Sequence, residues 1–184
     1  MKHQLTAFKG LIILEPEIFV DERGSFQETY NQAEFEKIIN RKINFCQDNQ
    51  SLSKKNVIRG LHYQTPPCEQ SKLVRVLSGS VLDVVVDLRR NSETFGQHFK
   101  ITLSKQNNLQ LFIPKGFAHG FKALTDQTIL SYKVDNFYSQ QDEQCILYND
   151  PELGINWELS NEKILISKKD LSGKLFSEFL SYNN

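Results

Sequence analysis

The chain has 184 residues, which fits one ordinary domain, and 39% of them are hydrophobic, enough to build a core. Its 22 basic and 22 acidic residues are interspersed and give a formal net charge of +0, which argues against a nucleic acid or an anionic membrane as partner. No apolar run approaches the roughly 20 residues of a membrane span, and the N-terminal segment lacks the order of a signal peptide. We therefore expect one cytoplasmic domain over residues 1–184, which can still hold a small anion at a local basic cluster.

The first well-signalled element is a helix that begins after Asn31. Asn31 is a good capping residue, Glu34 follows three positions later, and Phe35 and Ile38 belong to an apolar stripe. A second helix is expected near the C-terminus, at about residues 171–179.

Strands are expected over most of the remaining chain. Residues 73–77 and 81–88 are β-branched runs on either side of a short turn that contains Gly79, a pattern typical of a hairpin. The second run is apolar enough to be buried on both faces. Alternation of apolar and polar residues predicts two further strands, over 98–103 and 109–113.

Another strand is expected over residues 128–134, where alternation places Tyr132 on the same inward face as Leu130 and Val134. Many short strands, separated by turn residues and accompanied by few helices, favour an all-β antiparallel sandwich or barrel. Periodicity alone leads no further than this fold class.

Two motifs combine histidines with residues that form tight strand ends. They are Arg59-Gly60-Leu61-His62-Tyr63-Gln64 and Pro114-Lys115-Gly116-Phe117-Ala118-His119-Gly120. Residues 47–49 and 72–76 add amide, carboxylate and ammonium groups to the same β-rich part of the sequence. Because polar groups of this density are costly to leave unused in a core, the motifs indicate a functional site.

Together with further blocks along the chain, these motifs closely resemble the dTDP-4-dehydrorhamnose 3,5-epimerase family, and the match spans nearly the whole sequence. The further blocks are Asp21-Glu22-Arg23-Gly24-Ser25-Phe26, Thr94-Phe95-Gly96, Asn149-Asp150-Pro151 and Ser167-Lys168-Lys169-Asp170. The resemblance implies a cupin-type jelly roll with a few short peripheral helices. It also implies a homodimer, no metal and no cofactor, and inversion of two carbons of a 4-keto-6-deoxy sugar joined to dTDP, a step towards dTDP-L-rhamnose.

That reaction needs a base, a group that stabilises the enolate, and an acid on the opposite face of the sugar, because the C4 ketone acidifies the hydrogens on C3 and C5. By resemblance His62 is the base and Asp170 the carboxylate that orients its ring. Tyr132 matches the acid, and Lys72 matches the cation beside the C4 oxygen. The residues alone leave other uses open, since Asp170 could cap the C-terminal helix. Lys72 and Arg75 alternate, so at least one of them should point to solvent or a partner chain.

The resemblance also implies a set of substrate-binding residues, in which three cations suit the diphosphate, Glu28 suits the thymine edge, and Phe26 or Phe19 offers a stacking face. The matching positions are Arg23, Phe26, Glu28, Gln47, Asp48, Asn49, Arg59, His119, Tyr138, Glu143 and Lys169. From the residues alone, a structural role for His119 is equally open.

Three other functions are compatible with parts of this sequence. A metal-dependent cupin is disfavoured because Gln64 stands where a second histidine ligand would follow His62. The three cysteines, Cys46, Cys68 and Cys145, lack metal-ligand spacing and are expected to be free thiols. A noncatalytic nucleotide-sugar binder would need no acid and base. A single-centre epimerase stays open because residues 137–141 lack the proline that usually follows the family's aromatic pair.

Overall fold

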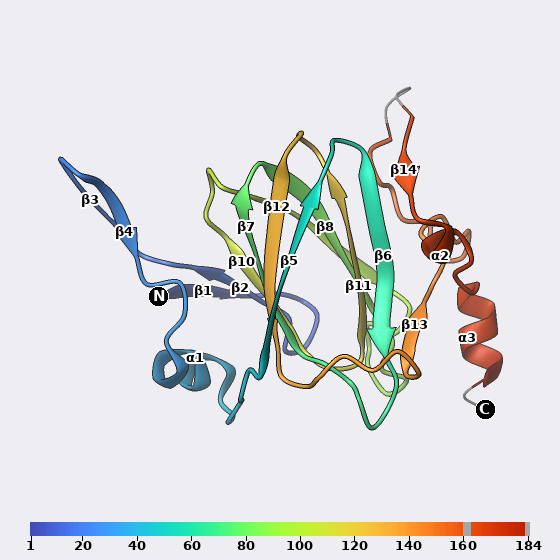
Figure 1. The fold of residues 1–184 in the computed structure, drawn as a ribbon. Coiled ribbons are helices and arrows are strands. Elements are labelled where there is room, and N and C mark those ends of the chain that lie inside the picture. The colour runs from blue at the N-terminus through green and yellow to red at the C-terminus, as the bar shows by residue number, and fades with distance from the viewer. Residues whose placement is uncertain (160–162, 183–184) are drawn as a thin grey trace.

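Two β-sheets face each other and form the body of the molecule in the computed structural model, which describes residues 1–159 and 163–182 (Figure 1). The expected all-β architecture is confirmed. Within the described residues, a two-stranded hairpin and three short helices complete the fold.

The first sheet has six strands, and its neighbours along the order are antiparallel. In that order they are β1 (Lys2–Leu5), β2 (Ile12–Glu15), β10 (Gln110–Ile113), β7 (Lys72–Ser78), β12 (Thr128–Val134) and β5 (Gln47–Ser53).

The second sheet is also antiparallel along its main order, with one short strand added in parallel beside β6. Its strands are β13 (Glu143–Cys145), β6 (Val57–Gln64), β11 (Phe117–Ala123), β8 (Ser80–Asp87) and β9 (His98–Ser104), and β14 (Leu165–Ile166) is the parallel addition.

The predicted hairpin between residues 73–77 and 81–88 is wrong, because β7 and β8 belong to different sheets. Strand β7 pairs with β10 and β12, whereas β8 pairs with β11 and β9. The turn at Gly79, where φ is +76°, carries the chain from one sheet to the other. A local turn signal specifies the bend but does not specify which strands will pair. Strand β8 is buried on both faces from Val81 to Asp87, as expected.

The first helix, α1 (Gln32–Ile39), is confirmed with its cap, since the Asn31 side chain accepts a hydrogen bond from the Glu34 backbone N–H. The helix covers the outer face of the first sheet, where the Phe35 and Phe112 rings meet edge to face at 5.1 Å. Strand β10 is therefore buried on both faces, including Gln110.

The single helix expected at 171–179 is replaced by two, α2 (Lys168–Leu171) and α3 (Phe176–Tyr182). Between them Lys174 forms a β-bridge with Ile146. A Cβ added at Gly173 would lie 2.9 Å from the Leu147 backbone nitrogen. The two backbone segments can therefore approach this closely only because residue 173 is glycine.

The core has three parts that follow from this layering. A central cluster between the sheets includes Val74, Val85, Leu111 and Phe117. A second cluster lies between the outer face of the second sheet and the C-terminal segments, and a third lies under α1. Side chains alternate along each strand, so a polar residue in phase with the central cluster points into the barrel.

The remaining hairpin, β3 (Ile18–Asp21) with β4 (Gly24–Gln27), projects from the body on the side of the view opposite β6, β14 and α2 (Figure 1). In the part of the chain described, no helix is both long and apolar enough to cross a membrane.

Candidate active site

A β-bulge in β6 places Arg59 and His62 on the same side of the second sheet. His62 pairs with His119, Arg59 pairs with Phe121, and the register shifts between these two pairs. Phe121 belongs to the central cluster, so this side faces the barrel interior. In a regular strand, residues three apart would point to opposite faces.

The backbone at the bulge requires glycine. Gly60 has a φ of +112°, and an added Cβ would lie 2.6 Å from the Gly120 Cα and from the His119 carbonyl oxygen. The close approach of β6 and β11 therefore depends on these two glycines, and the orientation of His62 depends on that approach.

His62 and Asp170 form a direct pair, with His62 Nε2 2.8 Å from Asp170 Oδ1. The other carboxylate oxygen accepts a hydrogen bond from the Gly60 N–H at 3.2 Å. Burial raises the pKa of Asp170, but the hydrogen bond and charge of His62, together with hydrogen bonds from Gly60 and Ser167, outweigh burial, so its pKa lies below the ordinary value. The carboxylate is thus ionised at neutral pH and fixes the ring so that Nδ1 is left for another partner.

Asp170 is not the cap of the C-terminal helix, which was the alternative use for it. Ser167 caps α2, and its hydroxyl accepts a hydrogen bond from the Asp170 N–H at 3.0 Å. The cap therefore sets the start of the helix that carries the carboxylate, while the Asp170 side chain is free to point at His62.

Tyr132 faces the barrel interior from the opposite sheet, packed against the central cluster that contains Leu130, as alternation predicted. Burial raises the pKa of Tyr132, with a further upward contribution from the charge of Glu143. The phenol therefore stays protonated well above neutral pH. Asn49 lies directly across β5–β12 from Tyr132, and the Gln47 side chain donates to the Asn49 side-chain oxygen at 2.8 Å.

Lys72 and Arg75 point to opposite faces of β7, as expected. Lys72 shares the inward face with Val74, and its Nζ lies 3.4 Å from the His62 carbonyl oxygen. Burial lowers the pKa of Lys72 to about 8, against upward contributions from Asp83 and Glu143. Arg75 lines an outer cavity beside Asp48.

The barrel interior holds a second histidine–carboxylate pair. His119 Nε2 lies 3.0 Å and 2.9 Å from the two carboxylate oxygens of Asp83, and both side chains are buried. Burial lowers the pKa of His119 despite the neighbouring carboxylate, so the ring is neutral near pH 7 and donates its Nε2–H to Asp83. Sequence reasoning did not select Asp83, although a carboxylate inside the apolar run 81–86 is a visible signal.

A polar cluster lies at the edge of the site beside β13. Glu143 accepts hydrogen bonds from the Tyr138 hydroxyl, at 2.7 Å, and from the Lys169 ammonium. Burial raises the pKa of Glu143, but these two donors and the charges of Lys169 and His62 together hold the pKa below its ordinary value. The Arg59 guanidinium donates hydrogen bonds to the Ser53 hydroxyl and the Leu52 carbonyl of β5.

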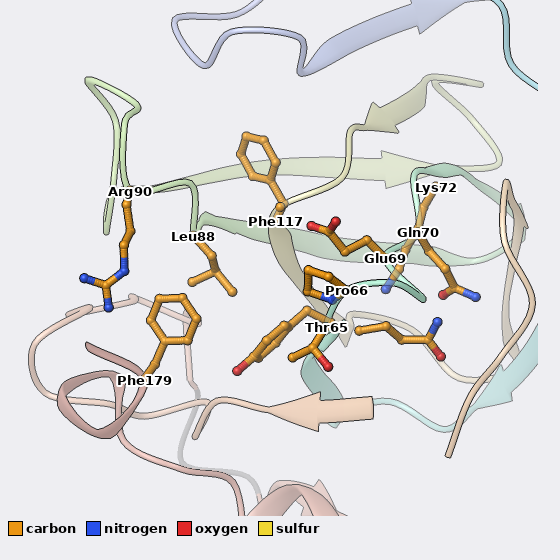
Figure 2. A pocket seen from close by; sticks show the side chains of 12 residues that line it. Thr65, Pro66, Glu69, Gln70, Lys72, Leu88, Arg90, Phe117 and Phe179 are labelled. Carbon is orange, nitrogen blue, oxygen red and sulfur yellow. The ribbon is translucent and has the colours of Figure 1, made fainter. Parts of the chain in front are cut away.

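Two cavities adjoin these residues. One of about 410 Å³ is bordered by Arg59, His62, Lys169 and Asp170. Another, of about 240 Å³, lies at the barrel mouth, and Figure 2 shows Lys72 and Gln70 on one side of it and Arg90 and Phe179 on the other. His62 and Asp170 thus border the first cavity and Lys72 borders the second, whereas Tyr132 is among the residues that line the cavity of Arg75 and Asp48.

Four residues expected to bind substrate are not brought to this cluster within one chain. Arg23, Phe26 and Glu28 lie on or just after the projecting β3–β4 hairpin, where Arg23 is exposed and paired with Asp21. Asp48 points away from Asn49 to the outer face of the first sheet, where its carboxylate binds the Lys133 ammonium at 2.9 Å.

Position 64 does not offer a free metal ligand. The Gln64 side chain is occupied by the carbonyls of Cys68 and Phe137 and by the Ser139 N–H.

Cys145 was expected to be a free thiol without a role in the site, but it lies directly across the β13–β6 pair from His62. Nothing in its sequence context indicates this position, because β13 is only three residues long.

Comparison with known proteins identifies relatives over nearly the whole chain. Residues 5–178 match the family model of dTDP-4-dehydrorhamnose 3,5-epimerase. A protein of that name from Salmonella typhimurium is 50% identical over 175 residues, which cover 95% of each chain.

Solved structures give the same result and share the cupin-type jelly roll. An epimerase from Legionella pneumophila in complex with dTDP-4-keto-L-rhamnose superposes with a TM-score of 0.92 at 44% identity, covering 96% of this chain and 93% of that one. A 3'-monoepimerase from Streptomyces bikiniensis in complex with dTDP-quinovose superposes with a TM-score of 0.89 at 29% identity, covering 96% and 89%. The chain belongs to the dTDP-4-dehydrorhamnose 3,5-epimerase family.

Proposed function

We propose that the protein inverts C3 and C5 of dTDP-4-dehydro-6-deoxy-D-glucose to give dTDP-4-dehydro-L-rhamnose. The observation that carries the proposal is that His62, held by Asp170, and Tyr132 enter the same barrel interior from opposite sheets. A base and an acid on opposite walls suit removal of a proton from one face of the sugar and its return to the other.

In this mechanism the His62 imidazole takes a proton from carbon next to the C4 ketone, and the ionised Asp170 stabilises the imidazolium that forms. Catalysis of this kind contributes about 10²- to 10⁴-fold. The Lys72 ammonium stabilises the enolate oxygen, and the Tyr132 hydroxyl returns a proton on the opposite face. His62 then releases its proton to solvent and Tyr132 takes one up, and the same cycle at the second carbon completes the inversion, with neither metal nor cofactor.

The proposal includes a homodimer, which the positions of the proposed nucleotide-binding residues support. Arg59, His119, Gln47 and Asn49 lie on strands of the two sheets, and Tyr138, Glu143 and Lys169 form the polar cluster beside β13. Arg23, Phe26 and Glu28 lie instead on or just after the β3–β4 hairpin. That hairpin exposes Phe19, Val20 and Phe26, with more than half of each side chain in contact with solvent. We propose that a second copy covers these apolar residues, so that the hairpin of one copy supplies diphosphate and thymine contacts to the barrel of the other.

The proposal includes one domain over the whole chain and a cytoplasmic location. Free thiols at Cys46, Cys68 and Cys145 suit a reducing compartment.

The decisive experiment is proton NMR of dTDP-4-dehydro-6-deoxy-D-glucose incubated with the protein in deuterated water. We expect deuterium at both C3 and C5 and formation of the L-rhamno product. The His62→Ala variant should show neither. Unchanged substrate with wild-type protein would exclude the epimerase and leave a nucleotide-sugar binder.

A single-centre epimerase is the second candidate, favoured by the missing proline in residues 137–141 and by the likeness to a 3'-monoepimerase. Tyr138 lies in this tract and is tied to Glu143, so its position would shape the sugar pocket. Deuterium at only one of the two carbons in the same NMR experiment would select this candidate.

A further inference from the structure

Three potential metal ligands converge beside the proposed base. His62, Cys145 and Asp170 each offer one ligand atom, and these atoms all lie within 4.8 Å of one another. They come from β6, β13 and α2, and Cys145 is brought in because β13 pairs with β6 in a register that sets it opposite His62. The set has one nitrogen, one sulfur and one oxygen ligand.

We propose that these three residues form a binding site for a zinc-class divalent cation and that the bound cation inhibits the enzyme by occupying the base. Zinc accepts this combination of ligands in tetrahedral geometry, with a fourth position left for water. A thiolate, a carboxylate and a neutral imidazole balance the two charges of the cation. The inhibitory part of the proposal rests on the proposed function of His62, whereas the binding part does not.

One of the three ligands is already held in place by a backbone hydrogen bond. Asp170 Oδ2 is held by the Gly60 N–H, which leaves Oδ1 facing His62 Nε2 at 2.8 Å. A cation bound to both atoms would replace the hydrogen bond that orients the base, and the two atoms would move slightly apart to accept it. The Sγ of Cys145 makes a weak contact with the Ile146 carbonyl at 3.5 Å, which costs little to lose.

Two of the three ligands, His62 and Asp170, can also be reached from solvent. The His62 side chain is 29% exposed, and the cavity of about 410 Å³ that borders His62 and Asp170 provides a path of entry. Binding forms metal–ligand bonds and releases the Cys145 thiol proton to water, with no oxidation or reduction. Hard cations such as Mg²⁺ prefer all-oxygen ligands, so the site should reject them.

The binding test uses Co²⁺ as a spectroscopic probe on the reduced full-length protein. We expect a thiolate-to-cobalt charge-transfer band in the near ultraviolet. The double variant Cys46→Ser/Cys68→Ser keeps Cys145 as its single cysteine and should retain the band. The Cys145→Ser variant should lose it. A band of unchanged intensity in Cys145→Ser, or no band in wild type, would overturn the site.

The inhibition test measures turnover with increasing Zn²⁺. Wild-type activity should fall and recover on addition of a chelator, Mg²⁺ should have no effect, and Cys145→Ser should need at least about 10-fold more Zn²⁺ for the same inhibition. Equal sensitivity of the two proteins would refute inhibition through this site. If the protein proves not to be an epimerase, the cobalt spectrum still decides whether the cation binds.

Discussion

Tyr132 differs from phenylalanine by one oxygen atom, so Tyr132→Phe removes the proposed acid with little change in packing. We expect this variant to keep some deuterium exchange next to the ketone, because His62 still removes the proton, but to lose full inversion. NMR in deuterated water separates exchange from inversion. Exchange abolished as completely as in His62→Ala would argue against separate acid and base residues.

The pH dependence of turnover should report Lys72. Its pKa of about 8 means that the ammonium loses its charge as pH rises through that value, and activity should fall there. The raised pKa of Tyr132 keeps the phenol protonated in this range, so the fall is not due to the acid. In Lys72→Arg the decline should move to higher pH, because guanidinium stays charged. A kcat–pH profile unchanged by the substitution would exclude this role.

Lys72 should make the protein more stable as pH rises through the range in which activity falls. The folded chain releases the Lys72 proton near pH 8, whereas an unfolded lysine holds it to about 10.5. Because the unfolded state then binds more protons, the contribution of Lys72 makes the free energy of unfolding rise between these two values. Urea unfolding of wild type and Lys72→Met across this window measures the difference. A wild-type curve that does not rise relative to the variant would contradict the shift.

Asp83 and Asp48 offer a matched comparison of a buried and an exposed carboxylate pair. Asp83→Ala leaves the neutral His119 ring without its buried acceptor and should lower the free energy of unfolding by about 1–3 kcal/mol. Asp48→Ala breaks an exposed pair with Lys133 and should cost less than about 1 kcal/mol. Urea denaturation measures both. Equal losses would show that the Asp83–His119 pair contributes no more than a surface pair.

At the scale of elements, α2 links folding to chemistry through its cap. Ser167→Ala removes the acceptor for the Asp170 N–H and should cost about 1 kcal/mol of stability. It should also lower kcat, because Asp170 is then less firmly held against His62, while Ser167→Thr should restore both properties. A variant with normal kcat and reduced stability would confine the cap to a structural role.

The elements also show what a sequence can and cannot specify. The capped helix after Asn31 and the inward face of Tyr132 depend on local rules, and both were predicted correctly. The turn at Gly79 was recognised, but its strands were assigned to one sheet, because pairing depends on contacts far along the chain.

The site itself follows the same division. The pairing of His62 with Asp170 spans 108 positions and was expected only from family resemblance. Asp83 was missed because its partner His119 lies far along the chain. Asp48 was expected to bind substrate, but neighbouring residues of a strand point to opposite faces, so Asp48 faces outward when Asn49 faces inward. Residue types suggested the chemistry, whereas the tertiary fold determined which of them meet.

At the scale of the whole molecule, the proposed exchange of hairpins can be tested by complementation. His62→Ala and Arg23→Ala should each be nearly inactive alone. After the two are mixed and allowed to exchange subunits, half of the dimers are mixed and each has one intact site, so about a quarter of wild-type activity should return. No recovery, with subunit exchange verified by native mass spectrometry, would place both residues in the site of one chain.

The seam between β6 and β11 has a practical consequence for redesign. Gly60 and Gly120 each leave no room for a methyl group against the facing backbone. Libraries intended to alter sugar preference will therefore lose most members if they randomise this seam. Gln47 and Asn49, on the terminal strand of the first sheet, are the better targets, since a new side chain there can be accommodated without moving the wall that holds the imidazole.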